Sequence, residues 1–336
     1  VEATCKLVDK FIESGFTYFD TALMYCGAKS EACTKKFLVD RYPREKYTLA
    51  TKLHADFIHT KEDRDRVFSE QLARTGVKYF DYYLLHEIGG SYYDKFKELD
   101  CFEWIQEKKR QGLVKTIGFS FHDTADVLED ILKNYPFFEF VQLQINYVDW
   151  ESEGIQARRC YEVACKYGKP VIVMEPVKGG TLVNLPEEAE ALFKAYNPSA
   201  STASWAIRFA ASLENVRVVL SGMNTMEQME DNIHTMKNTP PLSEEEYRVI
   251  DEAVNIINAN IAVACPGCAY CPAGCPMHIA IPQYFSLYNM DLQELKGKPW
   301  TSQRGYYANL AKSFGRPGDC IACGQCEAVC PQHLPI

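Results

Sequence analysis

Seven short apolar runs alternate with helix-period segments over the first 236 residues, and this alternation limits the fold more than any other feature. Each run is rich in β-branched and aromatic residues and is followed by a polar loop. Strands that alternate with helices form parallel sheets with right-handed crossovers. The predicted strands cover residues 16–21, 47–52, 79–86, 114–120, 140–146, 171–177 and 216–222. Predicted helices between them include residues 63–75, 94–111, 123–134, 154–167 and 225–236.

The strand count favours an α/β fold of the (β/α)₈ TIM barrel type. Such a barrel needs eight strands, and the sequence opens in a helical segment, so we expect the first strand to precede the present sequence. A doubly wound open sheet is the alternative. No G-x-G-x-x-G follows any predicted strand, however, so the usual dinucleotide fingerprint of that fold is absent.

Charge and hydropathy exclude several classes of function. The chain has 36 Lys and Arg against 45 Asp and Glu, a net charge of −9, which argues against a surface for nucleic acid or anionic lipid. No apolar run approaches the roughly 18–20 residues that a membrane span needs. No basic and apolar leader opens the sequence, so we expect a cytoplasmic protein.

Ionisable side chains stand at the ends of three successive predicted strands. Asp20, Lys52 and His86 occupy these ends, and Tyr25 follows Asp20 by five residues. In a barrel, catalytic groups come from the carboxyl ends of different strands. The pKa of a free phenol is about 10, so a tyrosine that donates a proton at neutral pH needs a nearby cation such as Lys52. Asp20 would keep that lysine charged, and His86 would donate a hydrogen bond to a substrate oxygen.

Five segments resemble those of the aldo-keto reductase superfamily. They are FDTALMYCG (19–27), LATKLH (49–54), DYYLLHE (81–87), IGFSFHD (117–123) and VLSGMNTMEQMEDN (219–232). The resemblance covers about residues 1–260 and implies a (β/α)₈ barrel that reduces carbonyls or oxidises alcohols with NAD(P)H. It also implies that the family's catalytic tetrad corresponds to Asp20, Tyr25, Lys52 and His86.

The same resemblance assigns residues to the nicotinamide cofactor. Ser120 and Gln142 match the positions that hold the carboxamide, and Asn232 matches the one near the adenine. The loop of Lys178, Gly179 and Gly180 would lie against the pyrophosphate. Ser221, Gly222 and Gln228 belong to the same expected site. Many NADPH-using members carry Lys and Arg where this chain has Gly222, Met223 and Gln228, so the choice between NAD and NADP stays open.

Eight of the 14 cysteines fall in the last 72 residues and form two matched runs of the pattern C-x₂-C-x₂-C-x₃-C-P. This is the bacterial ferredoxin run, in which three thiolates hold one [4Fe–4S] cluster and the fourth reaches the other. We therefore expect two clusters. One takes Cys265, Cys268, Cys271 and Cys330, and the other takes Cys275, Cys320, Cys323 and Cys326.

Other readings of the cysteines are weaker. Four-cysteine zinc sites also use C-x-x-C pairs, but the third cysteine and the trailing proline occur in both runs. Disulfides are disfavoured because the sequence shows no export signal. A single cluster with four spare thiols is a further alternative. Segments 281–292 and 302–314 read as helices, so the module resembles the α-helical ferredoxin-like domain of the iron–sulfur branch of the aldo-keto reductases.

These patterns divide the chain into a barrel over residues 1–242, a linker helix over 243–262 and an iron–sulfur domain over 263–336. A nicotinamide gives up two electrons as hydride, whereas a [4Fe–4S] cluster accepts one electron at a time. Direct exchange between them needs a converter such as flavin, and the sequence shows no flavin signature. The leading hypothesis is a reductase of small carbonyls or alcohols whose clusters serve structure or electron transfer. The alternatives are a ferredoxin-linked enzyme that exchanges electrons between clusters and substrate, and a non-catalytic electron-transfer or docking subunit.

Overall fold

The computed structural model describes residues 2–259, 262–263, 265, 267, 270–294, 300–330 and 334–336. Its seven strands form one parallel sheet in which each strand pairs with the next along the chain. The strands are β1 (Tyr18–Asp20), β2 (Thr48–His54), β3 (Phe80–Ile88), β4 (Val114–Phe121), β5 (Phe140–Gln144), β6 (Val171–Met174) and β7 (Val216–Val219). All seven predicted strands are therefore confirmed. Within the described chain, the edge strands β1 and β7 pair only with β2 and β6.

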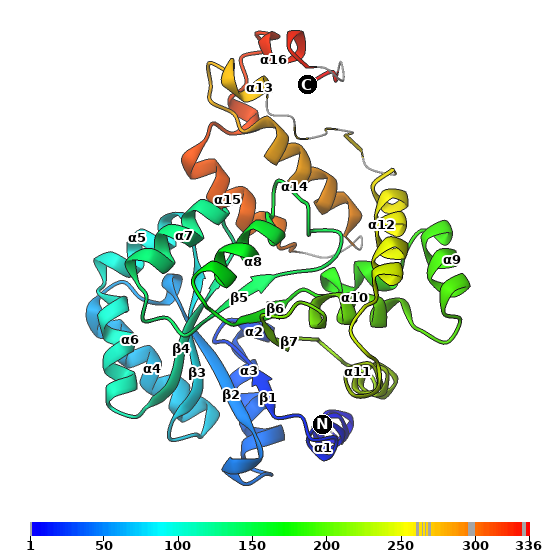
Figure 1. Ribbon diagram of the computed structural model, residues 1–336. Coiled ribbons are helices and arrows are strands. Elements are labelled where there is room, and N and C mark those ends of the chain that lie inside the picture. The colour runs from blue at the N-terminus through cyan, green and yellow to red at the C-terminus, as the bar shows by residue number, and fades with distance from the viewer. Residues whose placement is uncertain are drawn as a thin grey trace.

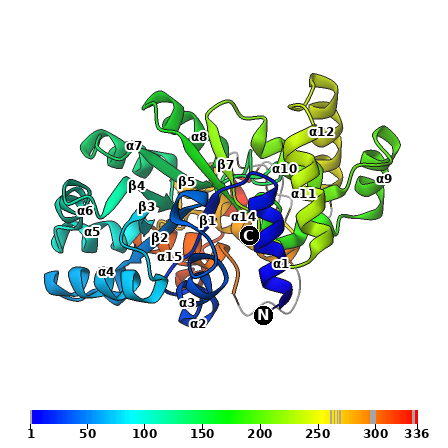
Figure 2. The same ribbon diagram turned by 90° about the horizontal axis from the view of Figure 1, so that it is seen from below.

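Helices surround these strands, as Figure 2 shows. The α-helices up to the last strand are α1 (Glu2–Glu13), α2 (Tyr25–Ala28), α3 (Ser30–Thr34), α4 (Lys61–Thr75), α5 (Gly90–Glu98), α6 (Cys101–Arg110), α7 (Ala125–Asn134), α8 (Ala157–Lys166), α9 (Glu187–Tyr196) and α10 (Thr202–Ala211). Beyond β7 follow α11 (Met226–Asn238), α12 (Glu244–Ala259), α13 (Tyr270–Ala273), α14 (Ile281–Gln293), α15 (Gln303–Ser313) and α16 (Gln325–Ala328). Shorter turns of 3₁₀ or π helix are η1 (Lys35–Val39), η2 (Arg44–Lys46), η3 (Ala55–Phe57), η4 (Lys178–Val183) and η5 (Pro317–Asp319).

The single helix predicted over residues 94–111 is wrong. The chain forms two helices there, α5 and α6, which are separated at Leu99 and Asp100. Asp100 has a φ of 49°, in the left-handed region, and this conformation ends the helical path before α6 begins. The periodicity of the two short helices runs on across the break, which explains why the sequence pattern does not reveal it.

The inner face of the sheet is apolar near one end and polar near the other. Ala50, Leu84, Phe140 and Ile172 form a small buried cluster from β2, β3, β5 and β6. Gly118 belongs to the same layer, because a Cβ there would come within 2.5 Å of the Phe140 ring. Side chains two residues further along a strand point to the same face. The next layer toward the carboxyl ends is therefore Lys52, His86, Ser120, Gln142 and Met174.

The linker helix predicted over residues 243–262 corresponds to α12 and is attached to the barrel. Ser243 caps α12 as expected, since its Oγ accepts from the Glu246 N–H at 3.2 Å and its own N–H donates to Glu246 at 2.8 Å. The Glu246 carboxylate also accepts hydrogen bonds from both terminal nitrogens of Arg208 on α10, at 2.6 and 2.9 Å. This bidentate pair fixes α12 against the outer helices.

The C-terminal domain, α13 to α16, stacks on one end of the sheet (Figure 1). It has its own small core, built from Ile279, Ile281, Tyr284, Leu287 and Leu310 among others. That core continues into the barrel, because Ile155 and Ala157 from the segment after β5 belong to the same cluster. The Ser152 and Ser286 hydroxyls lie 3.0 Å apart across the same contact. None of the helices in the described part of the chain is long and apolar enough to cross a membrane.

Candidate active site and cysteine centre

The polar layer at the carboxyl ends of the strands brings the predicted tetrad together. Asp20 ends β1, and its carboxylate forms an ion pair with the Lys52 Nζ from β2. Lys52 is fully buried, and its Nζ also donates to the Thr21 carbonyl at 3.0 Å. The same Nζ lies 4.8 Å from the centre of the Tyr25 ring. The Tyr25 ring meets the His86 ring edge-on, with their centres 5.7 Å apart.

Electrostatics keep Lys52 charged in this buried position. Burial by itself acts to lower the pKa of Lys52, but the Asp20 carboxylate and Tyr25 outweigh it, and the pKa lies above its ordinary value. Burial raises the pKa of Tyr25 more than the charge of Lys52 lowers it, so the pKa is raised overall and the phenol is protonated at neutral pH. The expected net lowering of this pKa by Lys52 is therefore wrong.

His86 is held as a neutral imidazole. Burial, followed by the charge of Lys52 and the neighbouring His54 and His122, lowers its pKa well below the ordinary value. The His86 Nδ1 has no hydrogen-bond partner in the described part of the protein. A buried polar atom without a protein partner is costly unless a bound group satisfies it. His86 therefore has hydrogen-bonding capacity to offer at the mouth of the barrel.

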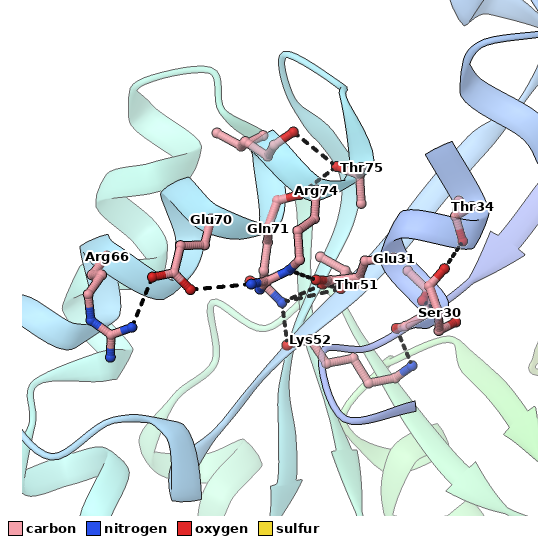
Figure 3. A network of polar contacts seen from close by, with 12 residues as sticks. Ser30, Glu31, Thr34, Thr51, Lys52, Arg66, Glu70, Gln71, Arg74 and Thr75 are labelled. Atoms are coloured by element: carbon pink, nitrogen blue, oxygen red, sulfur yellow. Dashed lines mark hydrogen bonds and ion pairs between the residues drawn. The ribbon is translucent and has the colours of Figure 1, made fainter. Parts of the chain in front are cut away.

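A buried polar network that no sequence motif reveals supports the strand that carries Lys52 (Figure 3). The Gln71 amide on α4 donates to the Lys52 carbonyl at 2.9 Å and to the Glu31 carboxylate at 2.9 Å. Glu31 also accepts from Thr51 at 2.8 Å and from the Arg74 Nε at 2.8 Å. Glu31 is 1% exposed, and a carboxylate so buried needs these partners. The network fixes β2 to α3 and α4, and its members lie too far apart in sequence to form a motif.

Ser120 and Gln142 lie side by side, as the resemblance implies. They are register partners on β4 and β5, and both are buried. The Gln142 Nε2 lies 3.6 Å from the Met174 sulfur, whereas its Oε1 has no partner among the described residues. The Ser120 Oγ accepts the Glu87 N–H at 2.8 Å and retains its own hydrogen for donation. An acceptor beside a donor is the pair that a carboxamide needs, so these residues fit a nicotinamide.

The side chain of Lys178 pairs with a carboxylate inside the protein, and the contact of its loop with a pyrophosphate stays a prediction. The Lys178 Nζ lies 2.7 Å from the Asp149 Oδ1, and both side chains are almost completely buried. The other carboxylate oxygen of Asp149 accepts from the amides of Gln144 and Asn146, each at 2.7 Å. The lysine charge is thus neutralised inside the protein. Gly179 and Gly180, with φ of 58° and 96°, shape the turn that follows.

The remaining residues expected at the cofactor lie together after β7. The Asn232 Nδ2 donates to the Ser221 Oγ at 2.9 Å. The Gln228 Oε1 accepts the N–H of Asn224 at 2.9 Å. A Cβ on Gly222 would meet nothing within 4 Å, so there is open space beside this backbone. The structure brings these four residues to one end of α11, and their role toward a cofactor stays a prediction.

The cysteines predicted for the second cluster line one cavity in the C-terminal domain. Cys275, Cys320, Cys323 and Cys326 all border a space of about 750 Å³, together with apolar residues such as Ile279 and Tyr284. These four cysteines form no disulfide. No three potential ligands in the described residues converge on a single metal ion. The ligands of a four-iron cube bind different irons and need not converge in that way. Four thiols around one cavity are compatible with the predicted cluster.

The structure describes three of the four cysteines predicted to hold the first cluster. Cys271 is buried, and Cys265 and Cys330 are partly buried. Cys268 lies outside the described residues.

Comparison with known proteins identifies both parts of the chain. Residues 2–255 match the model of the aldo/keto reductase family, and residues 264–334 match that of the 4Fe-4S dicluster domain. The chain therefore belongs to the aldo/keto reductase family and carries a C-terminal 4Fe-4S dicluster domain. A search of curated proteins found no match.

Solved structures show the same parallel barrel. The holo form of an aldo-keto reductase from Bacillus halodurans has a TM-score of 0.62 and 23% identity, over 74% of this chain and 86% of that one. An aldo-keto reductase from Klebsiella pneumoniae in complex with NADPH has a TM-score of 0.61 and 19% identity, over 75% and 84%. The fold predicted from the sequence, a TIM barrel followed by a small helical iron–sulfur domain, is confirmed.

Proposed function

We propose that the protein reduces small carbonyl compounds, or oxidises the corresponding alcohols, with NAD(P)H in the barrel site. The observation that carries this proposal is the buried group of Asp20, Tyr25, Lys52 and His86, in which one cation contacts both a carboxylate and a phenol ring. Ser120 and Gln142, on the next two strands β4 and β5, supply the donor and acceptor that fit a carboxamide.

Each side chain has a separate task in this chemistry. A bound nicotinamide would supply or accept the hydride at the substrate carbon. Tyr25 donates its proton to the carbonyl oxygen, and Lys52 stabilises the phenolate that remains, because its charge lies beside the ring. Asp20 keeps Lys52 protonated and oriented. His86, neutral at physiological pH, donates a hydrogen bond to the same substrate oxygen.

The C-terminal domain is proposed to bind two [4Fe–4S] clusters. Cys275, Cys320, Cys323 and Cys326 would hold one of them, because they border a single cavity. The other would use Cys265, Cys268, Cys271 and Cys330, by the spacing of the two runs. We assign these clusters to structure or to electron transfer with a ferredoxin-type partner, and the protein to the cytoplasm, where thiolates stay reduced.

The test is a turnover assay. Protein purified without oxygen is mixed with NADH or NADPH and a panel of aldehydes, ketones and dicarbonyls, and oxidation of the cofactor is followed by absorbance. The proposal predicts turnover with at least one carbonyl, with the preferred cofactor identified by its lower KM. Absence of turnover across the panel with both cofactors, in protein with full cluster content, would argue against a reductase.

One observation favours a second candidate, the ferredoxin-linked enzyme. Helix α15 of the C-terminal domain contacts the carboxyl ends of β3 and β4, beside the tetrad, so the two redox centres belong to neighbouring parts of the structure. If this candidate is correct, an oxidisable substrate added to the protein without any other cofactor would bleach the visible absorbance of the clusters. A pure hydride mechanism leaves this absorbance unchanged.

A further inference from the structure

Helix α15 of the iron–sulfur domain enters the mouth of the barrel. Tyr306 on this helix is buried, and its ring meets the His122 ring edge-on at 5.3 Å. The Asn309 amide, one turn further on, donates to the His122 carbonyl at 2.9 Å. Both contacts fall on the segment that follows β4. The iron–sulfur domain thus forms part of the wall around the predicted catalytic centre.

A carboxylate next to His86 lies under the same helix. Glu87 follows His86 in β3 with a φ of 58°, a strained conformation for a residue with a side chain. Its N–H donates to the Ser120 hydroxyl at 2.8 Å, which fixes the backbone. The Glu87 Oε2 lies 3.5 Å from the Nε2 of His54.

His54 connects this carboxylate with the tetrad. It is 2% exposed, and its ring meets the His86 ring edge-on at 5.2 Å. The His54 Nδ1 accepts the N–H of Asp56 at 3.1 Å, so the ring nitrogen that can donate a proton is Nε2, which faces Glu87. The tautomer and the orientation of His54 are therefore set from both sides.

The contact between α15 and Glu87 depends on a glycine. A Cβ on Gly305 would lie 2.9 Å from the Glu87 Oε1, closer than side-chain atoms normally approach. The bare backbone of α15 thus packs directly on the carboxylate. Because the contacted atom is the free end of a flexible side chain, an added methyl group would displace the carboxylate at little cost to the fold.

We propose that helix α15 of the iron–sulfur domain positions the catalytic His86 through Glu87 and His54. Gly305 sets the place of the Glu87 carboxylate, Glu87 holds His54, and His54 limits the movement of the His86 ring. The barrel site is then complete only when the iron–sulfur domain is docked on it. The inference rests on the proposed carbonyl reductase function, because His86 is catalytic in that function only.

The test compares two alanine variants of the full protein with both clusters in place. Gly305→Ala moves Glu87, whereas Gly154→Ala lies at the same domain interface and meets the Ser286 hydroxyl at 3.1 Å instead. We expect Gly305→Ala to lower kcat about tenfold to a hundredfold, with the KM for the nicotinamide cofactor unchanged, because small displacements of catalytic groups cost this much. Gly154→Ala should stay within about twofold of the wild-type kcat.

A double-mutant cycle separates positioning from general loosening. Glu87→Ala removes the carboxylate that the Gly305 backbone contacts, so Gly305→Ala added to it should have little further effect. Independent, multiplicative losses in the double variant would overturn the inference, as would equal kcat values for Gly305→Ala and Gly154→Ala.

A readout without turnover distinguishes this inference from the proposed function. Spectra of ¹⁵N-labelled histidine report which ring nitrogen carries the proton, and the chain has only 7 histidines to assign. We expect the His54 and His86 signals to shift in Gly305→Ala and to stay at their wild-type positions in Gly154→Ala. If the wild type shows no turnover but these signals shift, the function fails and the positioning contact stands. If turnover is normal and the signals of both variants are the same, the positioning role is wrong and the function stands.

Discussion

The barrel and the C-terminal domain are stabilised in different ways. The barrel has an extended apolar core in which residues such as Leu85, Phe119 and Val141 are completely buried between strands and helices. The C-terminal domain has a much smaller core, and large apolar side chains such as Ile321 and Val329 are at least half exposed. Its cavity is bordered by four of the predicted cluster ligands. We therefore expect the barrel to fold through burial of apolar surface, and the smaller domain to depend on bound clusters for its stability.

Removal of the clusters should have the largest effect. Metal binding free energy is folding free energy when ligands come from a small domain, so chelation and oxidation should unfold the C-terminal domain. Calorimetry of the holoprotein should show two transitions, and the cluster-free protein should retain only that of the barrel. Cys320→Ser combined with Cys323→Ser should reproduce this result. Cys33→Ser, at an exposed cysteine of the barrel, is the matched control and should leave both transitions unchanged.

Tyr25→Phe should affect activity and leave both transitions in place. The phenol is the proton donor, and loss of such a group costs about 10²- to 10⁴-fold in rate. We expect kcat for carbonyl reduction to fall by this factor, with cofactor binding measured by fluorescence unchanged. Tyr92→Phe, at a tyrosine that packs against His54 but has no assigned proton transfer, is the control. A Tyr25→Phe enzyme with wild-type kcat would contradict the assignment.

Arg208→Met should destabilise the barrel alone. The substitution leaves the partly buried Glu246 carboxylate without its bidentate partner, and breaking such a pair costs about 3–5 kcal/mol. Urea unfolding should show this loss in the barrel transition. Arg158→Met, which removes an exposed pair with Glu151, should cost about 0–1 kcal/mol. Equal effects of the two substitutions would mean that α12 is not held by the Arg208 pair.

Acid should weaken the barrel by a smaller amount. The pKa values of His86 and His122 are lowered by burial, so these rings stay neutral in the folded state while they take up protons in the unfolded state. The free energy of unfolding should therefore fall as pH drops below the ordinary histidine pKa of about 6.5, by up to about 1.4 kcal/mol per pH unit for each ring. Urea unfolding at pH 7, 6 and 5 measures this slope. His86→Gln should reduce it, whereas His234→Gln, on the exposed side of α11, should not.

The sequence predicts the fold well because its strands and ligands are local patterns. Each strand is a continuous apolar run, and the eight cysteines follow a fixed spacing. The tetrad can also be found from the sequence, because three of its members stand at equivalent ends of successive strands and Tyr25 follows the first of them closely. The break at Asp100 is not visible, because a single left-handed residue leaves the surrounding periodicity intact.

The features that the sequence does not predict depend on contacts between segments that are far apart in the chain. The pairing of Lys178 with Asp149 depends on how two loops pack, and no spacing rule links the two residues. The approach of Gly305 to Glu87 joins residues from different domains, so neither local propensity nor motif spacing reports it. The pKa of Tyr25 follows from burial in competition with Lys52, and the extent of burial is a property of the packed structure.

Isotope transfer from cofactor to product tests hydride transfer in the barrel most directly. The protein is supplied with NAD(P)H deuterated at the transferred position of the nicotinamide, and the alcohol product is analysed by mass spectrometry. Direct hydride chemistry in the barrel predicts deuterium on the carbinol carbon, both in the holoprotein and in residual activity after cluster removal. Product that carries only solvent hydrogen on that carbon would contradict direct hydride transfer, since electrons would then reach the substrate through the clusters.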